Sequence, residues 1–392
     1  MRLAVLLIPI LIAACSTTGE PPPAGRPLPS DLARLPDGTA AKAWTAPADE
    51  REARTRVARL LPQTVRDPAG WAGDLQAAFV HLDLVQSAPT YCAAIAVIEQ
   101  ESSFQADPVV AGLPAIVWRE LEQRSGRYGI PFFVVKAALL KASPDGRSYR
   151  ERIDTLKTEK QLNALYADMI AELPFGKDLL AGYNPVRTAG PMQVSIDFAE
   201  RHAREKPYPY KVGKTLRDEV FTRRGGLYFG IAILLDYPAP YSDAVYRFAD
   251  FNAGRYSSRN AAFQSALAHL SGQLLVLDGD LLRYEDGQAV DAPSTVENAA
   301  RAVAGVLRMN SGEIRRDLLL EKAPAFGRSP LFTRVFAEAG QAAGKEWPTQ
   351  AMPRIDLKSP KITRKLTTEW FARRVDERYR NCLKRAGSAG LL

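Results

Sequence analysis

The chain is poor in the residues that build metal sites and disulfide frameworks. Its 392 residues include three histidines and three cysteines. His81, His202 and His269 stand far apart in the sequence, and none has ligand-like spacing to another histidine or to a cysteine. We therefore expect no metal and no cofactor. The sequence also has one hydrophobic run of signal-peptide length and no second stretch that approaches the length of a transmembrane helix.

Charge of one sign is only modestly in excess. The formal net charge is +8, and removal of Arg2 with an N-terminal signal lowers it by one to +7. Such an excess favours an anionic partner such as the cell wall or a membrane surface. The richest basic stretch, residues 358–385, also contains acidic residues, which predicts a solvated helical face. No nucleic-acid-binding motif is present, so we expect no nucleic-acid partner.

The N-terminus has the features of an export signal. Arg2 precedes an apolar run, residues 3–14, that is too short for a permanent membrane span. The run ends in Ile-Ala-Ala before Cys15, which resembles the lipobox of bacterial lipoproteins. This resemblance implies removal of residues 1–14 and a lipid on Cys15; an ordinary cleaved signal with an incidental cysteine is the alternative. The expected location is the periplasmic face of the bacterial envelope, and Ser16 after the cysteine implies, by the same resemblance, the outer membrane with either leaflet open.

The segment after Cys15 is rich in Pro, Ser, Thr and Gly and cannot bury enough apolar surface to fold. We predict that residues 15–50 form a flexible tether between the membrane and a folded body. Cys92 and Cys382 lie in that body. An oxidising periplasm permits a disulfide between them, and two separate buried thiols are the alternative.

Apolar residues recur at three- and four-residue spacing through most of the body, which predicts a mainly α-helical fold. The one candidate β-hairpin joins residues 274–277 to residues 281–284 through Asp278-Gly279-Asp280, a good turn sequence. The helical patterns cover residues 51–61, 75–84, 90–102, 115–121, 155–173, 227–235, 244–251, 296–307 and 367–383.

Glu101 is the candidate catalytic acid. In a helix that begins at Thr90, Val97, Ile98 and Glu101 share one face, so Glu101 ends an apolar stripe. Burial there favours the protonated form that a general acid requires. The alternative is an ordinary glutamate at a helix end that reaches solvent or pairs with an arginine.

Four short segments strengthen the catalytic hypothesis. In order along the chain, they resemble the motifs of lysozyme-like lytic transglycosylases of the Slt type. An uncharacterised lipoprotein family with its own plan is the alternative. The long gap between the first two segments predicts a helical insertion at about 114–182. The segments are residues 98–104 (Ile-Glu-Gln-Glu-Ser-Ser-Phe), 189–194 (Ala-Gly-Pro-Met-Gln-Val), 225–235 and 248–254.

The resemblance implies a lysozyme-like domain over residues 51–290 and leaves residues 291–392 as a helical C-terminal extension. It also implies that Glu101 alone cleaves the MurNAc–GlcNAc bonds of peptidoglycan and leaves 1,6-anhydroMurNAc ends. A single catalytic carboxyl is a known exception to the paired-carboxylate rule of glycosidases. The substrate-binding residues implied by the resemblance are Ser102, Met192, Gln193, Tyr228 and Asn252.

Two rival functions remain at this stage. Phe251 replaces the tyrosine of the resembled motif, and the lost hydroxyl supports a non-catalytic peptidoglycan-binding lipoprotein. The second rival is a helical envelope scaffold that works through the insertion and the C-terminal region. The retained Glu101 argues against the first rival, and the ordered motifs argue against the second. The expected partners are peptidoglycan glycan strands and, through the insertion, an envelope protein.

Overall fold

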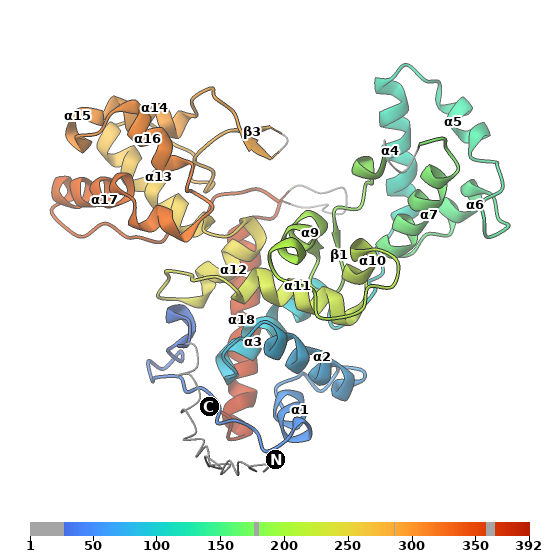
Figure 1. The fold of residues 1–392 in the computed structure, drawn as a ribbon, viewed down its shortest axis with the longest axis horizontal. Coiled ribbons are helices and arrows are strands. Elements are labelled where there is room, and N and C mark those ends of the chain that lie inside the picture. Colours follow the sequence, from blue (N-terminus) through green and yellow to red (C-terminus); the bar gives the residue numbers. More distant parts are fainter. Residues whose placement is uncertain (1–26, 176–179, 286, 358–364) are drawn as a thin grey trace, which may run out of the picture.

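The computed structural model describes residues 27–175, 180–285, 287–357 and 365–392. In this part the chain is mainly helical, as the sequence predicted. A central helical body carries two separate helical lobes that project from the same end (Figure 1). The body contains η1 (Ser30–Leu32), α1 (Glu50–Ala58), α2 (Pro68–His81), α3 (Ala88–Glu101), α9 (Ile196–Glu205), α10 (Leu216–Val220), α11 (Arg223–Leu235), α12 (Ala244–Ala253) and α18 (Thr368–Ser388).

Helix α3 is the centre of the body. Its residues from Ala88 to Ile98 are all buried, and Ser87 and Thr90 form a capping box that starts the helix. Helices α11 and α18 pack against α3, and α12 packs against α18. A disulfide joins Cys92 of α3 to Cys382 of α18, with 5.4 Å between their Cα atoms. The first quarter and the end of the chain therefore meet in one core.

The expected insertion forms the first lobe. Helices α4 (Leu113–Arg127), α5 (Phe132–Ala138), α6 (Tyr149–Asp154) and α7 (Glu159–Ala171) surround a small core of Leu139, Tyr149, Ile153 and Leu165. A short 3₁₀ helix, η2 (Ala181–Tyr183), precedes the return of the chain to the body.

The expected extension over residues 291–392 is wrong as a unit. The second lobe already begins with α13, within the range assigned to the lysozyme-like domain, and has its own hydrophobic core. Helix α18, at the other end of the expected extension, belongs to the body because its apolar face completes the core around α3. The lobe comprises α13 (Ser257–Ser271), α14 (Thr295–Ala302), α15 (Ala304–Leu307), α16 (Ser311–Leu318), η3 (Pro324–Arg328) and α17 (Pro330–Ala343).

The β-hairpin is also displaced from its predicted position. Two short hairpins are present in the described residues: β1 (Thr188–Ala189) with β2 (Val194–Ser195), and β3 (Tyr284–Glu285) with β4 (Gln288–Ala289). The predicted turn at Gly279 packs instead on α13, where Gln264 Oε1 accepts its N–H at 2.9 Å and Asn260 Nδ2 donates to its carbonyl at 3.1 Å. Side chains of α13 thus satisfy the main-chain groups of the predicted turn.

The tether prediction fails for residues 27–50. Leu32 is fully buried in the main core, and Asp31 forms a buried ion pair with Arg247 of α12. Trp44 stacks on Tyr91 of α3. A few anchoring side chains in a polar segment are enough to attach it to the body. The remainder of the tether, residues 15–26, lies outside the described residues.

Candidate functional site

The turn between β1 and β2 rests on α11, and two glycines of that helix, Gly226 and Gly230, make this possible. A Cβ atom at Gly226 would lie 2.5 Å from Pro191 Cδ, and one at Gly230 would lie 2.6 Å from Met192 Cβ. Any larger residue at either position would push the turn away from the helix. Gly225 is restricted in the same way by the carbonyl of Glu219. The glycine-rich segment is therefore a platform for the turn.

Gln193 ends this turn in the left-handed region, with φ of 49°. Its side-chain Nε2 donates to the carbonyl of Gly190 at 3.3 Å, and Thr188 Oγ1 donates to its Oε1 at 3.2 Å. The side chain is partly exposed, whereas that of Met192 is fully buried against α11. Of the two expected substrate-binding residues in this turn, Gln193 is the one that a substrate can reach.

The end of α3 holds the candidate acid. Glu101 is the last helical residue and is partly buried, and the Ser102 hydroxyl donates to the carbonyl of Ile98 at 3.1 Å. Ser103 and Phe104 follow with φ of 49° and 61°. Two consecutive non-glycine residues in the left-handed region, one of them aromatic, are uncommon and store strain.

The surroundings hold this strained segment in place. The Phe104 ring meets the Trp71 indole of α2 edge to face, with 5.2 Å between ring centroids. The Arg223 guanidinium of α11 lies over the Trp71 ring, 5.3 Å from the ring centroid. Glu99 is directed toward α18, where Arg378 Nε lies 3.9 Å from its Oε1. Glu99 therefore faces α18.

The remaining expected site residues have different surroundings. Tyr228 is a core residue, 1% exposed, with its ring against His202, Tyr208 and Phe229. Asn252 of α12 is partly exposed, and its Oδ1 accepts a hydrogen bond from Thr368 at 2.8 Å.

Helix α11 links the elements that carry these residues. It contacts α3, β2 and α12, so Glu101, Gln193 and Asn252 belong to one packed unit. The strained pair Ser103 and Phe104 and the partner Thr368 are not predicted from the sequence. No local signal marks the first two, since neither residue type favours positive φ, and Thr368 is more than a hundred residues from Asn252.

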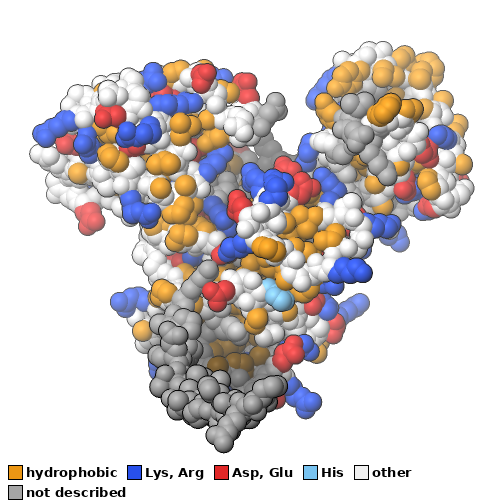
Figure 2. Space-filling model, in the orientation of Figure 1, with side chains coloured by type: hydrophobic (Ala, Val, Ile, Leu, Met, Phe, Trp, Pro, Cys, Tyr) orange, Lys and Arg blue, Asp and Glu red, His pale blue; other side chains and the backbone are white. Residues whose placement is uncertain are grey.

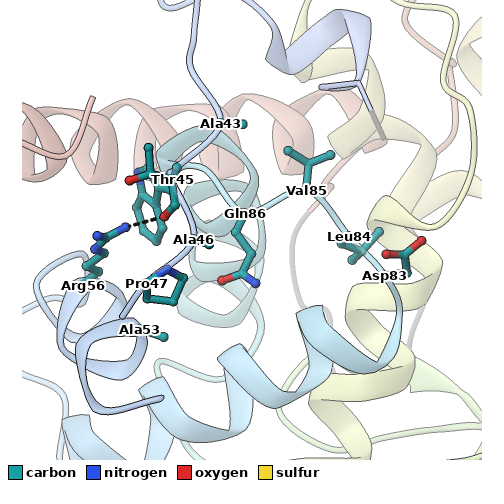
Figure 3. Close-up of a pocket in the computed structure, with 11 residues that line it drawn as sticks. Ala43, Thr45, Ala46, Pro47, Ala53, Arg56, Asp83, Leu84, Val85 and Gln86 are labelled. Atoms are coloured by element: carbon teal, nitrogen blue, oxygen red, sulfur yellow. Dashed lines mark hydrogen bonds between the residues drawn. The ribbon is translucent and has the colours of Figure 1, made fainter. Parts of the chain in front are cut away.

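A pocket of about 420 Å³ opens at the other end of α3 (Figure 3). Residues 43–47, α1 and residues 83–86 line it. Its one cation, Arg56, donates to the Thr45 carbonyl at 2.9 Å and pairs with Glu52 at 2.5 Å. Because α3 has 14 residues, this pocket lies about 20 Å from Glu101. It is not part of the candidate site.

The expected lipidation site, Cys15, and the signal over residues 1–14 lie outside the described residues. Within the described ranges, no helix has both the length and the apolar character needed to cross a membrane.

Residues 64–385 match the family described as protein of unknown function (DUF1615). The uncharacterized protein YaiW of Escherichia coli strain K12 is 49% identical to this chain over 328 residues, which cover 84% of this chain and 88% of YaiW. No solved structure matches the chain.

These matches correct the family resemblance drawn from the sequence, because the chain matches DUF1615 and no lysozyme-like or lytic transglycosylase family. The four segments misled because each has a local structural purpose that unrelated helical proteins share. They form a helix end, a tight turn, a glycine platform and, at Gly254, a helix C-cap with φ of 111°. The family model instead spans both lobes and reaches into α18, and the chain belongs to the DUF1615 family.

Proposed function

We propose that this protein is a peptidoglycan lytic transglycosylase with Glu101 as its only catalytic carboxyl. The proposal rests on the strained end of α3. There, a partly buried glutamate that ends an otherwise buried helix is followed by two residues with positive φ. Backbone strain persists only where the surrounding structure enforces it, and it concentrates at functional sites. Gln193, a further residue with positive φ on the same packed unit, supports the same site.

The reaction requires one group that first gives and then takes a proton. The Glu101 carboxyl protonates the glycosidic oxygen between MurNAc and GlcNAc, and the C1–O bond breaks. The C6 hydroxyl of the same MurNAc then attacks C1, and its proton returns to Glu101. The product is a 1,6-anhydro ring, no water is consumed, and the acid is regenerated. A second catalytic carboxylate is unnecessary for this sequence of steps.

The amides of Gln193 and Asn252 suit the N-acetyl groups of the sugars, because each carries both donors and an acceptor. Gln193 is held by Gly190 and Thr188, and Asn252 is held by Thr368. Such preorganisation reduces the cost of ordering these side chains on binding. Phe251 stacks on Phe371 of α18, with ring planes 10° apart, and so has a packing reason for lacking a hydroxyl. Phe251 therefore does not by itself favour a non-catalytic protein.

The proposed setting is the periplasmic face of the outer membrane. Acylation of Cys15 would anchor the chain there, with peptidoglycan glycan strands as the partner. Attachment of residues 30–44 to the body leaves a short link from the anchor, which supports action close to the membrane.

The test uses the purified full chain in a non-ionic detergent, incubated with purified cell-wall sacculi. Mass spectrometry of the released muropeptides identifies the new ends. Glu101→Gln is the test variant. Glu99→Gln is the matched control, because Glu99 lies two residues away on the same helix and is engaged by Arg378.

We expect anhydroMurNAc products from the wild type and from Glu99→Gln and none from Glu101→Gln. Hydrolysed MurNAc ends that depend on Glu101 would support the same catalytic site but would show that the reaction is hydrolysis. Binding to sacculi without release would overturn catalysis and favour the peptidoglycan-binding rival. Neither binding nor release would favour the envelope scaffold.

A further inference from the structure

A second site of different chemistry lies in the α4–α7 lobe. A cavity of about 440 Å³, here called the lobe cavity, separates the apolar faces of α4 and α7. This volume falls within the range of small-molecule pockets, which are mainly apolar with a few polar groups. The apolar residues that line it from these two helices are Leu113, Ile116, Val117, Leu121, Leu162, Leu165 and Met169.

The lobe has little buried apolar packing. Its core consists of four residues, three of which also line the cavity, whereas several large apolar side chains on and beside α5 are exposed, including Tyr128 at 79% and Phe133 at 73%. Hydrophobic side chains accordingly gather on the surface of this lobe (Figure 2). A pocket lined mainly by apolar side chains accepts the apolar part of a ligand, while its few polar groups fix the orientation of that ligand.

The polar part of the lining holds two arginines and two glutamates, and a third arginine lies close by. Arg124 and Arg187 line the cavity with Tyr166, and Arg217 is close enough that its charge acts on the Tyr166 hydroxyl. Glu120 is held by Arg124 at 2.7 Å, and Glu159 is the other carboxylate of the lining. The charges of the lining itself therefore balance, and Arg217 is a third cation beside it, within reach of the charges of Glu200, Asp197 and Asp218.

Two of these arginines bind only main-chain oxygens in the part of the chain that the structure describes. Arg187 Nη2 donates to the Gly182 carbonyl and Arg217 Nη1 to the Val186 carbonyl, at 2.8 and 2.9 Å. Burial lowers the pKa of Arg217, and the charge of Arg187 lowers it further, whereas Glu200, Asp197 and Asp218 act in the opposite direction. An anionic group beside Arg187 and Arg217 would bond both guanidinium groups directly and offset the repulsion between them.

We propose that the lobe cavity binds the acyl chain of an anionic amphiphile. The chain lies between α4 and α7, and its head group lies beside Arg187 and Arg217. Both a free fatty acid and an anionic phospholipid have this chemistry. The site is independent of Glu101, and its test does not depend on glycan cleavage.

The test is photo-crosslinking of the full chain with a diazirine-bearing palmitic acid in a non-ionic detergent, followed by peptide mapping. Val117→Trp fills the cavity, and Leu319→Trp is its control, because Leu319 is a 51%-exposed leucine in the other lobe. Arg187→Gln removes head-group charge, and Arg283→Gln, an exposed arginine elsewhere, is its control. Palmitate, hexadecanol and phosphatidylglycerol are the competitors.

We expect saturable labelling of α4 and α7 peptides that falls at least fivefold in Val117→Trp and at least threefold in Arg187→Gln, with both controls unchanged. Stronger competition by palmitate than by phosphatidylglycerol would assign a free fatty acid, and the reverse would assign a phospholipid. Equal competition by hexadecanol would overturn the head-group assignment. Absent labelling, or labelling that Val117→Trp leaves unchanged, would overturn the site. If Val117→Trp does not fold, Arg187→Gln and the peptide map decide.

Discussion

Asp31 and Arg247 form a two-point ion pair that is completely enclosed by the protein. Arg247 Nε lies 2.6 Å from Asp31 Oδ2, and Nη2 lies 2.8 Å from Oδ1. Arg247 Nη1 also donates to the Leu234 carbonyl at 2.7 Å, so all three of its nitrogens have partners. Neither side chain is exposed. The pair fixes the segment before α1 onto α12, which explains why an apparently tether-like sequence belongs to the body.

Asp31→Asn should lower the free energy of unfolding by about 3 kcal/mol, because it leaves Arg247 buried without a counter-charge. Denaturant unfolding of the two proteins measures the difference. Glu50→Gln is the control, since it breaks the exposed ion pair between Glu50 and Arg54. That change should cost about 0.5 kcal/mol or less. Equal effects of the two substitutions would show that the buried pair stabilises the protein no more than the exposed pair does.

The Cys92–Cys382 disulfide closes a loop across a sequence separation of 290 residues. In the chain-entropy model, a loop of this length stabilises the fold by about 5 kcal/mol as an upper figure. The double variant Cys92→Ala/Cys382→Ala should therefore unfold at a lower denaturant concentration than the wild type. A reductant should lower the wild-type midpoint and leave that of the variant unchanged. An unchanged wild-type midpoint would mean that the bridge contributes little.

Asp250 should make stability depend on pH. Burial raises the pKa of this carboxyl from 3.8 to about 6, although Tyr241 donates to it at 2.5 Å and the N–H of Ser258 at 2.7 Å. The pKa of Asp250 is higher in the folded than in the unfolded protein. The protonated carboxyl therefore stabilises the fold fully below about pH 4, and this stabilisation declines as the pH rises to about 6. The stability difference between wild type and Asp250→Asn should fall by about 3 kcal/mol over that window and stay level above it. Urea unfolding across pH 4 to 8 measures it, and a difference that rises with pH would contradict the expectation.

Gly230→Ala should destabilise the protein by about 1–3 kcal/mol, because the added methyl group would overlap Met192. It should also displace the turn that holds Gln193 and so lower glycan cleavage. Met192→Ala in the same chain should restore part of both losses, which a double-mutant cycle measures. Gly126→Ala in α4 is the control, since nothing lies within 4 Å of its added Cβ. Independent, additive effects of Gly230→Ala and Met192→Ala would contradict the proposed contact.

Apolar periodicity predicted several helices of the body. Helices α1, α3, α11, α12 and α18 all appear within a few residues of the expected ranges. The start of α3 was placed at Thr90, whereas the N-cap is Ser87 and Pro89 lies in the first turn. Helix α2 begins seven residues earlier than expected, because Asp67 caps it and Pro68 opens it.

Helix α13 had no such pattern, because it buries polar side chains. Arg259, Asn260 and Gln264 are each at most 3% exposed, and they bind the loop at Gly279 and the carbonyls near Glu321. Those partners lie tens of residues away, so their hydrogen bonds cannot be inferred from local sequence. The same holds for the candidate site. Glu101 was recognisable as the end of an apolar stripe, but the strain after it comes from packing against α2 and α11.

The arrangement of α3 and α18 also bears on how the chain would reach its final state after the proposed export. If the polypeptide crosses the membrane N-terminus first, α3 emerges while α18 is still some 290 residues behind. Until α18 arrives, one flank of the most buried helix stays uncovered and Cys92 has no bonding partner. Both lobes must therefore be delivered before the body can close. A chain interrupted anywhere between α3 and α18 would keep an exposed apolar helix and a free thiol at Cys92. Quality-control proteases recognise the first of these features, and thiol oxidoreductases recognise the second.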